Sequence, residues 1–313
     1  MKSFIAVLVL LTIAFPASRA LSGEAAGAGA KSGAAKKAAK PAPKEKAKKE
    51  HVLERIAVVG ASLSDGFGSG TKLAPVLEEV IRRSHKPIVD ASSSLFFMRP
   101  MDTGTEQLAK ALEAKPTLVV AVDFLFWFGY GAAGSDGKPL GKEEDRLRLL
   151  EEGLKLLEKV EAPLVLGDFP DMSDAVGGPL SAAQVPKAEA LAALNRRIGE
   201  WAEKRPNVIL VPLARNIEEI RGDKAVKVGK WEWPSGQSAR LLQEDKLHPT
   251  AEGLVAVCGM IVEGLGAAKV GTAAKDFDPD RKAVLKRVEA ASEKKAKAGK
   301  PSSKTGKKKA ASS

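Results

Sequence analysis

Short apolar runs alternate with longer amphipathic segments through the middle of the chain. Each run spans five or six residues, which is typical of strands buried on both faces of a parallel sheet. The five predicted strands are Arg55–Val59, Pro87–Ala91, Thr117–Val122, Pro163–Gly167 and Asn207–Pro212.

Segments with helical periodicity separate these runs. Between Leu147 and Leu157, for example, leucines recur at spacings of three and four residues, which places them on one face of a helix. The alternation predicts an α/β domain with an open, mostly parallel five-stranded sheet and helices on both faces. The expected helices are Leu73–Arg83, Thr105–Ala114, Glu143–Val160, Pro186–Lys204 and Ala251–Leu265, with a short terminal helix at Asp280–Ala291.

The two ends of the chain lack this pattern. Residues 21–50 are rich in Ala, Gly, Lys and Pro, and residues 294–313 repeat that composition. Such segments bury too little apolar surface to offset the loss of chain entropy. We therefore expect a disordered linker at 21–50, one domain at 51–280 and a basic, largely disordered tail at 281–313.

The first twenty residues have the features of an export signal. Lys2 precedes the apolar run Phe4–Phe15, and the small residues Ser18 and Ala20 follow it. A membrane-spanning helix needs roughly 20 apolar residues, and this run is shorter. We therefore expect cleavage after Ala20, a periplasmic or secreted protein, and no transmembrane anchor after cleavage.

The formal net charge of +11 is concentrated at the ends. Residues 1–50 carry ten basic and three acidic side chains, residues 281–313 carry twelve and two, and residues 51–280 have a net charge of −6. Nucleic acid is therefore not expected as a partner of the domain. Two interpretations of the ends remain: they bind an anionic envelope polymer or membrane surface, or they are solubilising spacers.

Two motifs carry candidate chemistry. The first predicted strand leads into Gly60-Ala61-Ser62-Leu63-Ser64-Asp65-Gly66, whose glycines allow a tight turn that lifts a serine hydroxyl to the sheet edge. Gly/Ser turns of this kind are also common without any function.

The second motif is Asp245-Lys246-Leu247-His248-Pro249, just before the last predicted helix. An Asp three residues ahead of a His can accept the imidazole Nδ1–H, which leaves Nε2 free as a base. A loop salt bridge or half of a metal site are the alternatives. The sequence offers no further His or Cys ligands for a metal here, so we expect neither a metal nor a cofactor.

Together the motifs resemble those of the SGNH (GDSL-type) hydrolases. Gly60–Gly66 matches the family's first block except at Ala61, and Asp245–Pro249 matches its last block, Asp-x-x-His-Pro. The resemblance covers roughly residues 55–267. It implies a flavodoxin-like three-layer α/β/α sandwich in which Ser62 is the nucleophile, His248 the base and Asp245 the residue that orients the base.

The family's two other oxyanion donors, a Gly after the second strand and an Asn after the third, are not matched. The chain has Ser92, Ser93 and Ser94 at the first place and Asp123 at the second. Hydroxyl or backbone N–H groups of the three serines are candidate substitutes. An ionised Asp123 would oppose an oxyanion unless a cation such as Arg99 neutralises it.

Aromatic residues gather near the predicted site. Five lie in Phe124–Tyr130, including Trp127, and Trp231 and Trp233 come shortly before Asp245. They either extend a buried strand or line a pocket for an acyl chain or a sugar ring.

The sequence thus predicts an exported serine esterase or acyl hydrolase of the SGNH type, with acyl transfer as a variant, whose substrate is a lipid or carbohydrate ester. The alternative is a non-catalytic envelope protein that binds a glycan or lipid in a degenerate site and polyanions through its lysine-rich ends.

The export signal gives the first testable prediction. Mass spectrometry of the mature N-terminus in the natural host should find a chain that begins at Leu21, because cleavage follows small residues at the −3 and −1 positions. A mature chain that begins at Met1 or Lys2 would refute it.

Overall fold

The computed structural model describes residues 50–134 and 137–298. Its main sheet has five strands, all parallel, in the order β2-β1-β3-β4-β5. This confirms the predicted sheet and each of its five strands. The strands are β1 (Ile56–Val58), β2 (Val89–Asp90), β3 (Leu118–Ala121), β4 (Leu164–Gly167) and β5 (Val208–Val211). The predicted export signal and most of the predicted linker lie outside the described residues.

The central strands are buried throughout because both faces of the sheet are covered by helices. β1, β3 and β4 have no exposed residue, and their registers pair Ile56 with Leu118 and Val120 with Val165. Since no strand face meets water, the strands read as continuous apolar runs rather than alternating ones.

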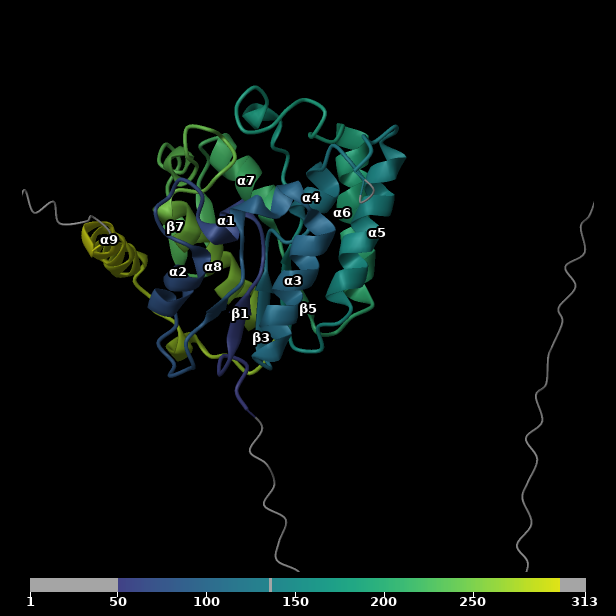
Figure 1. The fold of residues 1–313 in the computed structure, drawn as a ribbon. Coiled ribbons are helices and arrows are strands. Elements are labelled where there is room, and N and C mark those ends of the chain that lie inside the picture. Colours follow the sequence, from purple (N-terminus) through teal and green to yellow (C-terminus); the bar gives the residue numbers. More distant parts are fainter. Residues whose placement is uncertain (1–49, 135–136, 299–313) are drawn as a thin grey trace, which may run out of the picture. The chain divides into compact units, whose positions relative to one another are not determined.

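The helices form two layers, one on each side of the sheet (Figure 1). One layer contains α3 (Pro100–Glu113), α5 (Glu144–Leu157) and α6 (Ala188–Glu203). The other contains α2 (Leu73–Val80) and α8 (Ala251–Ala267). The three-layer α/β/α architecture is therefore as predicted. None of the described helices is long and apolar enough to cross a bilayer.

Several shorter elements were not predicted because they lie in what the sequence presents as connections. They are α1 (Ser62–Asp65), α4 (Phe126–Tyr130), α7 (Leu213–Arg221), the antiparallel hairpin β6 (Val226–Val228) and β7 (Trp231–Trp233), and the 3₁₀ turns η1 (Ser94–Met98), η2 (Ser173–Ala175), η3 (Ala239–Leu241) and η4 (Ala274–Asp276).

The C-terminal helix α9 (Arg281–Ala298) is longer than predicted. Val284 and Val288, four residues apart, are buried where α9 packs on α2 and α8. Arg287 adds ion pairs to Glu79 at 2.7 Å and Asp278 at 3.0 Å. The predicted domain boundary after residue 280 is therefore too early, because this basic segment has an apolar stripe that the domain covers.

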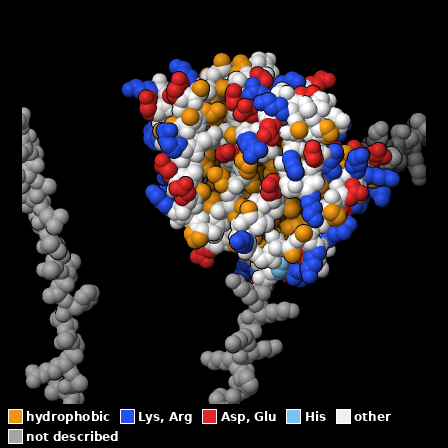
Figure 2. All heavy atoms as spheres, turned by 180° about the vertical axis from the view of Figure 1, so that it is seen from behind, with side chains coloured by type: hydrophobic (Ala, Val, Ile, Leu, Met, Phe, Trp, Pro, Cys, Tyr) orange, Lys and Arg blue, Asp and Glu red, His pale blue; other side chains and the backbone are white. Residues whose placement is uncertain are grey.

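Charged side chains of both signs are interspersed on the face shown in Figure 2. This distribution fits the near-balance of acidic and basic residues within 51–280 and gives that face no patch of a single sign.

The packing of α5 gives a second prediction. A β-carbon on Gly153 would lie 2.7 Å from Cγ of Phe128 on α4, whereas one on Gly199 of α6 would meet nothing within 4 Å. Gly153→Ala should therefore lower the free energy of unfolding by about 1–3 kcal/mol through overpacking. The control Gly199→Ala should raise it by about 0.5–1 kcal/mol through helix propensity. Urea unfolding measures both, and equal stabilisation by the two variants would contradict the packing.

Candidate active site

The two sequence motifs meet at the carboxyl ends of the strands, where α1, α4 and α7 also lie (Figure 1). Ser62 is the first residue of α1, directly after β1. His248 lies in the turn before α8, which Thr250 caps by accepting the N–H of Gly253 at 3.1 Å. The fold therefore brings together side chains that are 186 residues apart in the chain.

A continuous chain of hydrogen bonds links the three predicted triad residues. His248 Nε2 is 2.9 Å from Ser62 Oγ, and His248 Nδ1 is 2.7 Å from Asp245 Oδ2. Asp245 Oδ1 also accepts the backbone N–H of His248 at 3.0 Å. When Nδ1–H donates to the carboxylate, Nε2 carries no proton and accepts a hydrogen bond from the Ser62 hydroxyl.

The electrostatics of Asp245 suit this arrangement. Partial burial opposes ionisation of its carboxyl, but hydrogen bonds from His248 and Leu247 outweigh burial and lower its pKa. Asp245 is thus held as a carboxylate, the form that fixes the His248 tautomer and stabilises a developing imidazolium.

Gln243 ties the two motif loops to each other. Its Nε2 donates to the carbonyl of Phe67 at 2.7 Å and to that of Pro249 at 2.8 Å. The Phe67 ring also packs against the imidazole of His248, with ring centroids 4.7 Å apart. The approach of His248 to Ser62 therefore has support beyond the triad bonds.

The serine turn requires a glycine at its start. Gly60 has φ +153°, and a β-carbon there would lie 2.1 Å from Oδ1 of Asp123. From α3, the amide of Gln107 accepts the N–H of Gly60 at 2.8 Å and donates to its C=O at 3.0 Å. A buried side-chain amide thus satisfies the turn's backbone and fixes its position.

Asp123 holds the first turn of α1. Its buried carboxylate accepts the N–H groups of Leu63 at 2.9 Å and Ser64 at 3.2 Å, and the Ser64 hydroxyl at 2.6 Å. Burial raises the pKa of Asp123, although these hydrogen bonds partly oppose the shift.

Arg99, which the sequence analysis named as a cation that could neutralise Asp123, does not pair with it. Arg99 is exposed and pairs with Asp102 at 3.5 Å. Within the described ranges, no Lys, Arg or His forms an ion pair with Asp123.

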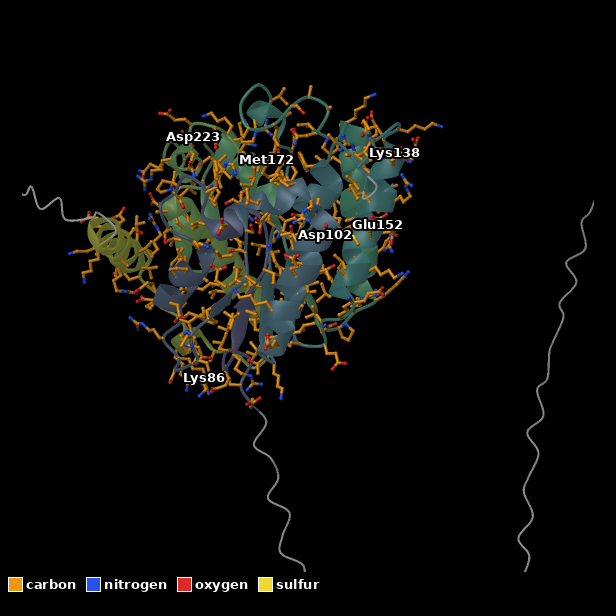
Figure 3. The ribbon with its side chains drawn as sticks, viewed as in Figure 1. Lys86, Asp102, Lys138, Glu152, Met172 and Asp223 are labelled. Atoms are coloured by element: carbon orange, nitrogen blue, oxygen red, sulfur yellow. The ribbon has the colours of Figure 1, made fainter. Side chains whose placement is uncertain are left out.

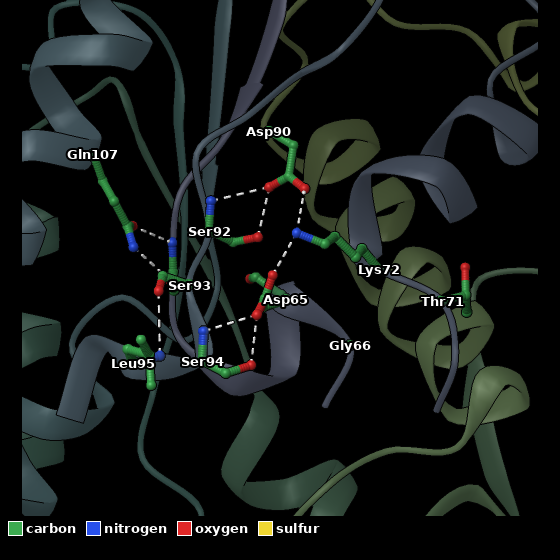
Figure 4. A network of polar contacts seen from close by, with 12 residues as sticks. Asp65, Gly66, Thr71, Lys72, Asp90, Ser92, Ser93, Ser94, Leu95 and Gln107 are labelled. Atoms are coloured by element: carbon green, nitrogen blue, oxygen red, sulfur yellow. Dashed lines mark hydrogen bonds and ion pairs between the residues drawn. The ribbon is translucent and has the colours of Figure 1, made fainter. Parts of the chain in front are cut away.

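The three serines after β2 are occupied by structural hydrogen bonds (Figure 4). The Ser92 hydroxyl donates to Asp90 and the Ser94 hydroxyl donates to Asp65, each at 2.5 Å. Ser93 Oγ accepts the N–H of Leu95 at 3.2 Å.

Lys72 joins the two carboxylates of this network, at 2.5 Å from Asp65 and 3.3 Å from Asp90. Burial opposes ionisation of Asp65, but the contacts with Lys72 and Ser94 prevail and lower its pKa. Ser94 therefore ties α1 to the loop after β2, and the hydroxyl directions of Ser92 and Ser94 give no support to their predicted role as oxyanion donors.

One candidate oxyanion donor remains on the nucleophile itself. The backbone N–H of Ser62 opens α1, and no acceptor for it is present among the residues that the structure describes. N–H groups of a first helical turn have no partner within the helix, so this one is available to a ligand.

The predicted tryptophans do not line the cavity beside Ser62. Trp231 and Trp233 are buried under α8, where their indole N–H groups donate to the carbonyl of Pro279 at 3.1 Å and to Glu252 at 2.8 Å. Trp127 is buried between Phe126 and Phe97. The predicted strand extension is wrong, because Phe126–Tyr130 form the helix α4. Of the five aromatic residues at 124–130, Phe126 lines the cavity beside Ser62 and the other four are buried in the core.

An apolar cavity of about 50 Å³ adjoins Ser62 and His248. Most of its wall comes from aliphatic side chains on α7 and α8, together with Phe169 and Met172 from the loop after β4. Met172 lies at the carboxyl end of the sheet near α7 (Figure 3). The aliphatic residues of α7 and α8 in this wall are Leu213, Ile217, Ile220, Val257 and Met260.

Asp168 is a residue that the sequence reasoning missed. It follows β4 directly, as Ser62 follows β1, so its strand-end position could have identified it. It lines the same cavity as Ser62, accepts the N–H of Ala214 at 2.7 Å, and has its pKa raised by burial. In the described part of the chain, no three His, Cys, Asp or Glu side chains converge in a way that could hold a metal ion.

Comparison with known proteins finds similarity among solved structures. No family model and no curated protein matches the chain. An acetylxylan esterase from Geobacillus stearothermophilus matches with a TM-score of 0.45 and 14% identity, over 70% of this chain and 95% of that one. A psychrotrophic esterase from Pseudoalteromonas sp. matches with a TM-score of 0.42 and 15% identity, over 68% of this chain and 97% of that one. A GDSL-like lipase from Bacteroides thetaiotaomicron matches with a TM-score of 0.43 and 14% identity, over 69% of this chain and 89% of that one.

The buried carboxyl of Asp123 gives a prediction about stability and pH. Because burial raises its folded-state pKa, ionised Asp123 destabilises the fold, and this cost is absent below the unfolded pKa of about 3.9. An Asn at this position can still accept from Leu63 and Ser64 and donate to the Ser64 hydroxyl. The stability of Asp123→Asn relative to wild type should therefore be greater at pH 8 than at pH 4.

Urea unfolding at the two pH values measures this difference. Asp123→Ala serves as the comparison, because it leaves the donors without an acceptor and should cost about 1–3 kcal/mol. A gap between Asp123→Asn and wild type that stays the same at both pH values would show that burial does not raise the pKa of this group.

Proposed function

We propose that the protein is a serine ester hydrolase with Ser62 as nucleophile, His248 as general base and Asp245 as the residue that orients His248. The observation that carries the proposal is the chain of hydrogen bonds from Ser62 Oγ through both imidazole nitrogens to Asp245. Nucleophile, base and orienter within hydrogen-bond reach of one another are what activation of a serine hydroxyl requires.

In the proposed reaction, His248 Nε2 takes the Ser62 hydroxyl proton as Oγ bonds to the acyl carbonyl carbon. The bond from that carbon to the alcohol oxygen then breaks, and His248 returns the proton to the departing alcohol. Water repeats the sequence on the acyl-serine and releases the acid. Transfer differs only in that a second alcohol replaces the water.

The oxyanion site is the weak part of this machinery. The Ser62 N–H supports a developing oxyanion, whereas the hydroxyls of Ser92 and Ser94 donate to carboxylates and Asp123 brings acceptors. Loss of one donor typically costs about 10²–10³ in rate, so we expect slow turnover.

A second candidate function is a non-catalytic glycan- or lipid-binding protein of the cell envelope. The observation that favours it is the carboxylate of Asp123 in the wall of the cavity, where it opposes negative charge at the carbonyl oxygen. The intact triad geometry favours the enzyme, because binding alone has no need of a base at 2.9 Å from a serine hydroxyl. In either case we propose that the protein acts after export and that its lysine-rich ends contact anionic envelope polymers.

Ester turnover and active-site labelling test the proposal. Ser62→Ala and His248→Ala should each abolish hydrolysis of p-nitrophenyl acetate and labelling by a fluorophosphonate probe, and the double variant should be no worse than either. Asp245→Asn should retain some turnover, because the base is misoriented but present. Ser235→Ala, an exposed serine on the loop after β7, is the control and should behave as wild type. Turnover that survives Ser62→Ala undiminished would refute the assignment, and a wild-type protein with neither turnover nor labelling would leave the binding function.

A further inference from the structure

A second hollow meets the cavity beside Ser62. It is an open groove of about 1080 Å³ between α6, α7 and the loop after β4. Asp168 and Phe169 line both the groove and the apolar cavity. The two spaces therefore adjoin at the carboxyl end of β4, on the same side of the sheet edge as the proposed nucleophile.

The two spaces differ in chemistry. The cavity is enclosed largely by aliphatic side chains, and Asp123 and Asp168 are among the few charged groups in its wall. An apolar wall of this kind suits the acyl part of an ester. The groove is twenty-fold larger by volume and open to solvent, and charged side chains stand along it.

Polar groups in the groove wall are held in place. Arg221 pairs with Asp171 at 3.3 Å and Asp174 at 2.7 Å. The side-chain amide of Asn195 makes two hydrogen bonds with the backbone of Phe169: it accepts the N–H at 2.7 Å and donates to the C=O at 2.8 Å. Fixed carboxylates and a guanidinium can bind several hydroxyl groups without reorganising.

Small side chains on α6 supply the apolar part of the wall. Ala188 and Ala192 are exposed in the groove, beside the half-buried Leu191 and Val185. A wall that offers polar groups beside a shallow apolar surface matches a sugar ring, which has hydroxyls at its rim and C–H groups on its faces. A fatty acyl chain would remove water from the ion-paired side chains of this groove without offering them any hydrogen bond.

We propose that the groove between α6 and α7 is the alcohol subsite of the proposed esterase and that it takes a polyhydroxylated alcohol, a saccharide that carries an O-acyl group. The proposal rests on the proposed function. Asp168 is the specificity-determining residue at the junction, because it lines both spaces and its carboxylate is an acceptor for substrate hydroxyl groups.

The experiment compares two acetyl esters that differ only in their alcohol. p-Nitrophenyl acetate has a leaving group without aliphatic hydroxyls, whereas mono-O-acetylated cellobiose has many. Ala192→Trp fills the groove from an exposed helix position, and Ala267→Trp, at an exposed position near the end of α8, is the matched control. Asp168→Asn keeps the shape of the junction residue and removes its charge.

For Ala192→Trp we expect kcat/KM on acetyl cellobiose to fall by about tenfold or more, mainly through KM, with p-nitrophenyl acetate changed less than about twofold. Asp168→Asn should lower kcat/KM on acetyl cellobiose more than on p-nitrophenyl acetate, and Ala267→Trp should change neither. Equal losses on both esters, no loss on either, or no wild-type hydrolysis of acetyl cellobiose would each overturn the subsite. Faster wild-type hydrolysis of a long-chain monoglyceride than of acetyl cellobiose would overturn it in favour of lipid.

The proposed function and the subsite fail in distinguishable ways. If the triad assignment is wrong, p-nitrophenyl acetate hydrolysis is insensitive to Ser62→Ala. If only the subsite is wrong, that hydrolysis still depends on Ser62 while Ala192→Trp and Asp168→Asn leave the preference between the two esters unchanged.

Discussion

The hydrogen bonds from the first turn of α1 to the buried carboxylate of Asp123 are the contacts on which the candidate site depends. A helix of four residues cannot sustain itself, because nucleation fixes several backbone dihedrals for a single internal bond. Asp123 supplies acceptors for the turn from β3, and Gln107 fixes the preceding glycine from α3. Ser62 is thereby positioned by two neighbouring elements of the core, and His248 needs only to approach it.

This way of holding the serine has a chemical cost. An oxyanion is best served by donors, and Asp123 brings an acceptor to the cavity that adjoins Ser62. An Asn at this position could accept the N–H groups of Leu63 and Ser64 through its oxygen and donate to the Ser64 hydroxyl through its amide group, so these contacts do not require a charged residue. The same residue that fixes Ser62 therefore brings an acidic group beside it, and we expect the stability of the fold to depend on the ionisation of this group.

The sheet and the contact between Asp245 and His248 could be predicted from the sequence because each rests on local information. Buried parallel strands are continuous apolar runs, and the spacing of Asp245 and His248 places both in one turn. The surroundings of Ser62 depend on side-chain direction, which no local pattern encodes. Ser92 and Ser94 are near α1 as expected, but carboxylates already take their hydroxyls. Trp233 is near Asp245 in sequence, yet its ring packs beneath α8 because a large apolar side chain gains more from burial than from lining a site.

The division between a small apolar cavity and a large polar groove follows from how the chain leaves β4. Gly167 ends that strand with no room for a side chain, since a β-carbon would lie 2.3 Å from the carbonyl of Val122 and 2.4 Å from Leu213. α7 can therefore pack close to the strand end and turn its aliphatic residues toward α8, which closes the cavity. The next residue, Asp168, accepts the N–H of Ala214 at the start of α7 and directs the loop over α6. A single Gly-Asp step thus separates the apolar cavity from the polar groove.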